Sequence, residues 1–230
     1  MNLPTERLPA RHRYAALLVV LLTALVIQSL RSAVDVDDLA LDGVSAALAI
    51  AIYMAVFRGT REHRLMAVTL ALVVAIGLVR DAVPPHHERA WALAFQALTA
   101  FYLCAAVVRI LYDLFREPRP GIQNILGAIC GYLIAGAFFG CINIIAYMLA
   151  PAAYNVDPAV VEIAANWHGR IALFSYYAYT QLLTIGYADV TPLRAPATTL
   201  SLFAAIFGVF YTAVVVSQLV AVAQSERQER

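Results

Sequence analysis

The sequence predicts an all-α membrane protein with six transmembrane helices and one shorter re-entrant helix. The chain has 230 residues, of which 62% are hydrophobic and only 13% are charged. Soluble domains carry roughly a quarter of charged residues, so this composition is too apolar for that class. The apolar residues are also gathered into long runs, and a run of about 18 or more is typical of a membrane-spanning helix.

Six long apolar runs account for the predicted spans. They cover residues 14–30, 39–57, 65–83, 91–114, 122–149 and 197–223. At about 1.5 Å per residue, each is long enough to cross roughly 30 Å of hydrocarbon. The first run follows three arginines and is longer than a typical signal-peptide core, so we interpret it as the first membrane helix.

The distribution of arginine predicts the orientation. All basic residues are arginine, and eleven of the sixteen fall on one side when the spans alternate. Loops rich in arginine stay on the cytoplasmic side. We therefore expect a multi-pass cell-membrane protein with both termini in the cytoplasm. The absence of lysine suggests GC-rich codon usage, and hence a bacterial inner membrane.

A proline-rich break divides the chain. Residues 116–121 read Arg-Glu-Pro-Arg-Pro-Gly, which cannot continue a helix. We take them as a linker between a four-helix N-terminal membrane domain, 1–115, and a second domain, 122–230. The second domain contains a run of 13 apolar residues, Ile171–Leu183, that is too short to span and suits a re-entrant helix.

The stretch that follows this short run carries a recognisable motif. Thr184–Asp189 reads Thr-Ile-Gly-Tyr-Ala-Asp and lies between the short run and the last predicted span. This order resembles the pore region of the tetrameric potassium channel superfamily, whose filter is typically Thr-Val-Gly-Tyr-Gly-Asp. The resemblance covers roughly residues 122–223, a little under half of the chain.

The resemblance implies a set of ion ligands and an assembly. The filter ligands would be the backbone carbonyls of Thr184, Ile185, Gly186 and Tyr187, with the Thr184 hydroxyl completing the innermost site for K⁺. One chain supplies a quarter of such a ring, so three further copies are implied. The expected function is passive, homotetrameric, potassium-type cation conduction within membrane lipid. No cofactor is expected beyond the permeant ion.

Residues behind the filter are assigned from the same resemblance. In the family, the acidic residue after the filter pairs with an aromatic residue of the pore helix. Asp189 would therefore be braced by Tyr176 or Tyr177. The alternative, an acidic ring at the pore mouth, ranks second. Gly208 stands where the family has a hinge glycine in its last helix, although close helix packing explains a small residue equally well.

Ala188 departs from the family pattern. Glycine at this position normally has positive φ, and a Cβ there costs roughly 1–2 kcal/mol per residue. Either the filter absorbs this strain or its outer end takes another shape. The second outcome would weaken the outermost ion site. A weakly selective channel that also passes Na⁺ is therefore the nearest alternative function, and a non-conducting membrane regulatory subunit is another.

The four-helix domain lacks the charge pattern of a voltage sensor. Such a sensor needs several arginines at every third position, but Arg109 alone lies in the run 91–114. We therefore expect no steep voltage gating. Arg80 is expected to pair locally with Asp81, and His168 is expected to be isolated at the membrane interface.

Other functions have little support in the sequence. A net charge of +1 gives no general attraction for nucleic acid. No nucleophile, histidine and acid occur at catalytic spacing, and there is no glycine-rich phosphate loop, so we expect no enzyme. The three cysteines match no metal-ligand or disulfide pattern.

Overall fold

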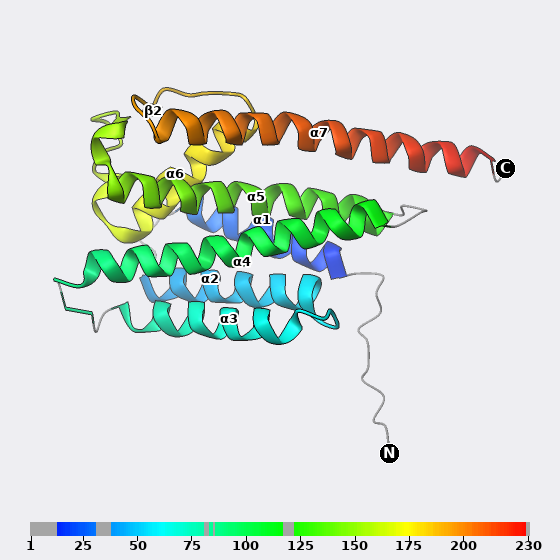
Figure 1. The fold of residues 1–230 in the computed structure, drawn as a ribbon, viewed down its shortest axis with the longest axis horizontal. Coiled ribbons are helices and arrows are strands. Elements are labelled where there is room, and N and C mark those ends of the chain that lie inside the picture. The colour runs from blue at the N-terminus through cyan, green and yellow to red at the C-terminus, as the bar shows by residue number, and fades with distance from the viewer. Residues whose placement is uncertain (1–12, 31–37, 81–82, 85, 117–121, 229–230) are drawn as a thin grey trace, which may run out of the picture.

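The fold is a bundle of long helices with one short, inclined helix near one end (Figure 1). The computed structural model describes residues 13–30, 38–80, 83–84, 86–116 and 122–228, with the side chains of 29, 30, 39 and 218–228 left aside. Its α-helices are α1 (Arg13–Leu30), α2 (Asp38–Ile52), α3 (His63–Leu78), α4 (Glu88–Arg116), α5 (Ile122–Leu149), α6 (Trp167–Leu182) and α7 (Ala197–Gln228). A π-helical turn, η1 (Tyr53–Phe57), extends α2, and 3₁₀ turns occupy η3 (Pro151–Ala153) and η4 (Ile163–Ala165).

The protein is an all-α membrane protein, as the apolar runs predict. Each predicted span contains a helix within its described residues. Within the described residues, four segments are long and apolar enough to cross a membrane: Ala40–Phe57, Glu88–Arg116, Ile122–Leu149 and Ala197–Ser217. Two shorter apolar helices, Arg13–Gln28 and His63–Leu78, lie beside them. That these two also span stays a prediction.

Helix α5 is the centre of the bundle, because it contacts α1, α4, α6 and α7. Glycines on its surface let large side chains approach its backbone. The Tyr14 ring of α1 lies 3.2 Å from where a Cβ of Gly127 would be. A Cβ at Gly131 would overlap the hydroxyl of Tyr211, and one at Gly136 would overlap the ring of Tyr179. The close approaches therefore bring α1, α6 and α7 against a single helix.

A short antiparallel pair of strands is the one departure from helix that matters for the site. β1 (Tyr154–Val156) pairs with β2 (Val190–Pro192), with Asn155 opposite Thr191. The sequence pattern does not predict these strands, because a strand of three residues is too short to show an alternation of apolar and polar residues. β2 begins directly after Asp189, so the pairing ties the segment that leaves the filter to the loop after α5.

The predicted linker, 116–121, lies outside the described residues except for Arg116, which ends α4. Across this break, α4 and α5 form the most extensive helix pair in the bundle. We call residues 13–116 the front half and 122–228 the pore half. Their division into two domains stays a prediction.

Candidate functional site

Helix α6 carries the filter segment, Thr184–Asp189, at its C-terminal end. The helix has 16 residues, which is about 24 Å and too short to cross the hydrocarbon. It begins at Trp167, four residues before the predicted run. Asn166 is its N-cap: the side-chain oxygen accepts a hydrogen bond from the Gly169 amide at 2.6 Å. In Figure 1, α6 lies inclined between α5 and α7.

The last carbonyls of α6 hold the first half of the filter segment. The amides of Ile185 and Gly186 both donate to the Thr180 carbonyl, at 2.9 and 3.3 Å, and the Thr184 amide donates to Gln181 at 3.0 Å. A helix end leaves such carbonyls without intrahelical partners, and here the filter amides supply them. The filter amides are thus turned toward α6.

The backbone of the filter segment alternates in handedness. Thr184 has φ of +56° and Gly186 has φ of +66°, whereas Ile185 and Tyr187 are not among the positive-φ residues. Glycine adopts this conformation without cost, but a β-branched residue there is strained. Strain of about 1–3 kcal/mol of this kind is concentrated at functional sites.

The expected strain at Ala188 is not present. Among the described residues, Thr184 is the single non-glycine residue with positive φ, and Ala188 instead begins a turn with Asp189. Of the two outcomes that the sequence left open, the structure has the second: the outer end of the filter takes another shape.

The filter segment is exposed on the single chain, although its flanks are buried. Thr184 to Ala188 are all exposed, whereas Leu182 and Val190 on either side are each 2% exposed. Irregular backbone at membrane depth is tolerated where it is covered by protein or lines water. The segment thus presents the surface that a shared pore would need.

Tyr176 on α6 braces the outer end of the filter. Its hydroxyl donates to Oδ2 of Asp189 at 2.9 Å. Its ring also stacks on Tyr187, with centroids 6.3 Å apart and planes inclined by 4°. The Tyr187 side chain therefore packs against α6. Tyr177, the other brace candidate, points elsewhere, because its hydroxyl pairs with Ser201 Oγ on α7 at 2.6 Å.

The strand pair fixes the segment that follows the filter. The Asp157 amide donates to the Asp189 carbonyl at 2.9 Å, next to the β1–β2 ladder. Within β1, the buried Tyr154 hydroxyl donates to Asn143 Oδ1 on α5 at 2.8 Å. Burial raises the pKa of this hydroxyl, so it stays protonated and able to donate. Asp189 is thereby connected to α5 as well as to α6.

The C-terminal end of α6 is held by α5 and α7. Tyr132 on α5 donates to the Leu182 carbonyl at 3.0 Å, and Tyr179 on α6 donates to the Leu133 carbonyl at 2.6 Å. Gly208 on α7 lies so close that a Cβ would overlap the Leu182 carbonyl oxygen. This contact supports the packing interpretation of Gly208, while the hinge interpretation stays a prediction.

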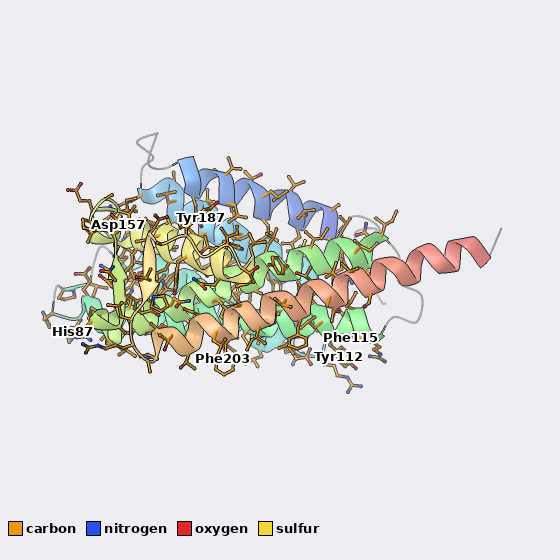
Figure 2. The ribbon with its side chains drawn as sticks, turned by 90° about the horizontal axis from the view of Figure 1, so that it is seen from above. His87, Tyr112, Phe115, Asp157, Tyr187 and Phe203 are labelled. Carbon is orange, nitrogen blue, oxygen red and sulfur yellow. The ribbon has the colours of Figure 1, made fainter. Side chains whose placement is uncertain are left out.

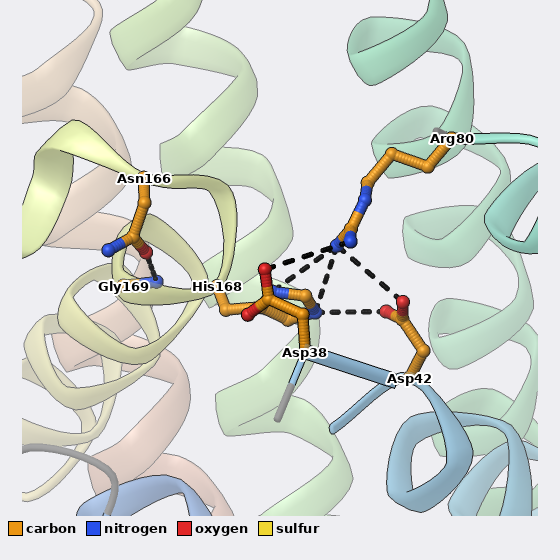
Figure 3. Close-up of polar contacts among 6 residues, drawn as sticks. All are labelled: Asp38, Asp42, Arg80, Asn166, His168 and Gly169. Carbon is orange, nitrogen blue, oxygen red and sulfur yellow. Dashed lines mark hydrogen bonds and ion pairs between the residues drawn. The ribbon is translucent and has the colours of Figure 1, made fainter. Parts of the chain in front are cut away.

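The N-terminal end of α6 is held by charged residues of the front half. We call Asp38, Asp42, Arg80 and His168 the His168 clamp (Figure 3). His168 Nδ1 lies 3.0 Å from Asp38 Oδ1, and Nε2 lies 2.9 Å from Asp42 Oδ1. Arg80 approaches both carboxylates, at 3.8 and 3.5 Å. Arg80 Nη1 also lies 3.3 Å from both ring nitrogens of His168.

The clamp corrects one expectation and was missed by sequence reasoning. His168 was expected to be isolated, but it is 8% exposed and contacts two aspartates. Asp81, the expected partner of Arg80, lies outside the described residues. Asp35, Asp37 and Asp38 lie between the first two predicted spans, and Asp42 begins the second, but nothing in the sequence indicates which basic residue these aspartates meet.

The pore half matches a known family. Residues 128–225 match the model of a family described as an ion channel. The match covers α6, the filter segment and most of α5 and α7, which are the elements whose geometry is given above. It supports a place for the chain in the ion-channel superfamily. No curated protein and no solved structure matches the chain.

Proposed function

We propose that the protein is a passive, homotetrameric cation channel of the potassium type, without steep voltage gating. The match of residues 128–225 to an ion-channel family supports the general class. The observation that carries the proposal is the filter segment itself: its backbone alternates in handedness, and its amides are bound to the end of α6. Carbonyls of Thr184 to Tyr187 can then coordinate a dehydrated K⁺.

A tetramer follows from the exposure of this segment. One chain leaves Thr184–Ala188 exposed, which is tolerable in a membrane if four copies enclose a common water-filled axis. Helix α7 also exposes large apolar side chains, including Phe203 (Figure 2) and Phe210. Lipid and neighbouring copies are the partners that can cover such side chains.

A weakly selective cation channel is the second candidate, and Ala188 favours it. Ala188 does not have the positive φ that glycine normally has at this position, and it forms a turn with Asp189 instead. A changed outer end weakens the outermost ion site and reduces discrimination between K⁺ and Na⁺. A non-conducting regulatory subunit is the remaining alternative, and it is separated from both channels by measuring flux.

Flux of thallous ion into proteoliposomes tests the proposal. Wild-type protein should give uptake that K⁺ competes for more strongly than Na⁺. Equal competition supports the second candidate, and absence of uptake supports a regulatory subunit. Gly186→Ala should lower uptake at least about tenfold, because the added Cβ strains a position with φ of +66° in each subunit.

Gly59→Ala is a matched control. Gly59 also has positive φ, +86°, and a Cβ at either glycine meets nothing within 4 Å. Both substitutions therefore strain the backbone without a clash, but Gly59 lies in the turn before α3. Uptake by Gly59→Ala should equal that of wild type. An equal loss in both variants would mean that strain alone, rather than the filter, explains the result.

A further inference from the structure

A basic cavity lies at the end of the bundle where α1 begins and α4 ends. It has a volume of about 390 Å³. Its charged and polar lining comes from four helices or turns: Arg13, Arg58, Arg109, Asp113, Arg116 and Asn124. We call this cavity the arginine pocket. It is lined by both halves of the chain, since Asn124 belongs to α5 and the arginines to the front half.

The arginine pocket has more positive charge than its described residues neutralise. Arg109 pairs with Asp113 at 2.9 Å. The guanidinium of Arg13 lies 4.6 Å from the centre of the Tyr14 ring, and Arg116 donates to the Tyr112 hydroxyl at 3.3 Å. Four arginines and one aspartate line the cavity, so three positive charges are in excess within the described lining.

One buried donor in the arginine pocket also lacks an acceptor. Nε of Arg109 is buried and has no hydrogen-bond partner within the described part of the chain. A buried donor without a partner costs about 1–3 kcal/mol, and more for a charged group. An anion in the cavity would reduce this cost and the mutual repulsion of the arginines. Phosphate suits several guanidinium groups, because its oxygens accept their planar pairs of N–H donors.

The surroundings indicate that the phosphate belongs to a lipid. Tyr112 and Phe115 on α4 and Ile122 on α5 are each more than half exposed next to the arginine pocket. In Figure 2, Tyr112 and Phe115 lie at the end of the bundle away from Asp157 and His87. Basic pockets between membrane helices at the ends of the spans are suited to anionic headgroups. A lipid there can place its acyl chains on the exposed apolar side chains.

We propose that the arginine pocket binds the phosphate of an anionic phospholipid and that this lipid joins the front half to the start of α5. The proposal goes beyond conduction, and its readout is binding. Lipid binding can therefore be tested independently of ion conduction.

The test is a titration of the purified full-length chain in neutral detergent. The probe is dioctanoyl phosphatidylglycerol, and binding is followed by the rise in melting temperature. Dioctanoyl phosphatidylcholine and inorganic phosphate, at equal ionic strength, are the comparison ligands. Phosphatidylglycerol should bind at least about tenfold more tightly than either. Equal binding of phosphatidylcholine, or of inorganic phosphate, would overturn the lipid assignment.

Paired variants locate the site. Arg58→Gln with Arg116→Gln should weaken phosphatidylglycerol binding on the order of tenfold. Arg61→Gln with Arg64→Gln removes the same charge near the same end, but neither residue lines the cavity. This control should change binding less than about threefold. Equal losses in the two pairs would indicate a general surface field and overturn the proposal.

A variant that binds the lipid more tightly cannot be explained by poor folding. Asp113→Asn removes the one acidic group in the described lining and leaves Arg109 without its ion pair. Phosphatidylglycerol should then bind several-fold more tightly than it binds wild type. Unchanged or weaker binding by a folded Asp113→Asn variant would contradict the site.

Discussion

The two ends of α6 are held in different ways. Its C-terminal end is held by contact without free space: Gly208 lies against the Leu182 backbone, and Tyr132 donates to the Leu182 carbonyl. Its N-terminal end is held by the packing of Trp167 on Trp91 and Phe95 of α4, and by the ionic contacts of the His168 clamp, in which Asp42 is 31% exposed. Close packing resists displacement of even a few tenths of an ångström, whereas partly exposed ion pairs are weak and adjust.

The two ends of α6 therefore differ in which parts of the protein hold them and in how rigidly. The end next to the filter segment has its close contacts with α5 and α7, and the far end is connected to the front half by ion pairs. Substitutions at each end of α6 test this difference.

Substitution at the C-terminal end should have the largest effect. Gly208→Ala places a Cβ on the Leu182 carbonyl oxygen, and the helix backbone has to move to make room. Overpacking of this kind typically costs about 1–3 kcal/mol. We expect a lower melting temperature in detergent and loss of thallous flux. Gly43→Ala on α2, where a Cβ meets nothing within 4 Å, is the control and should be neutral or slightly stabilising.

The same variant separates the two interpretations of Gly208. If Gly208 serves only as a hinge, alanine should alter the open probability and leave the melting temperature at the wild-type value. That result would contradict the packing account of this end of α6.

The substitution Ala188→Gly should have an intermediate effect, and it should act on selectivity rather than stability. Glycine allows the positive φ that Ala188 does not adopt in the structure. We expect a higher preference for K⁺ over Na⁺, measured by competition in the flux assay. An unchanged preference would mean that the turn at the outer end does not control selectivity.

Removing the ionic contact at the N-terminal end should have a small effect. Asp42→Asn replaces one carboxylate of the His168 clamp, and partial exposure limits the loss to about 1 kcal/mol. High salt should lower the melting temperature of wild type toward that of the variant, because salt screens an ionic contact. The measurement is thermal unfolding at low and high salt. A loss as large as that of Gly208→Ala would abolish the difference between the two ends.

The smallest effect is expected from the membrane voltage. The ion pair of Arg109 with Asp113 is local to α4, and no further arginine lies in the span before it down to Arg89. Each charge that crosses the field contributes about 2.3 kcal/mol per 100 mV, so a single paired arginine gives a shallow response. Bilayer recordings should show a nearly voltage-independent open probability. A steep conductance–voltage curve with several gating charges would refute this.

The sequence predicted the parts of the fold that depend on local pattern. Long apolar runs indicate helices at the right places, and the short run before Thr184 predicted the short helix α6 that precedes the segment Thr184–Asp189. The Tyr176–Asp189 contact was anticipated from a resemblance, because it joins residues 13 positions apart within a known motif.

Contacts between distant residues were not predictable in this way. His168 and Asp42 are 126 positions apart and lie on different helices, so no period or spacing connects them. The sequence left open whether Ala188 would be strained, and it gave no sign that Thr184 would have positive φ. Amino-acid type gives only a preference for positive φ, whereas hydrogen bonds to Thr180 and Gln181 decide where the backbone adopts it.

The reversal potential of purified protein in a planar bilayer, with K⁺ on one side and Na⁺ on the other, tests the central claim most directly. The account predicts a cation current through the ring formed by Thr184 to Tyr187, with a reversal potential displaced toward K⁺. Gly186→Ala should abolish that current, and Gly59→Ala should preserve it. A current carried by anions, or no current from a folded tetramer, would contradict the account.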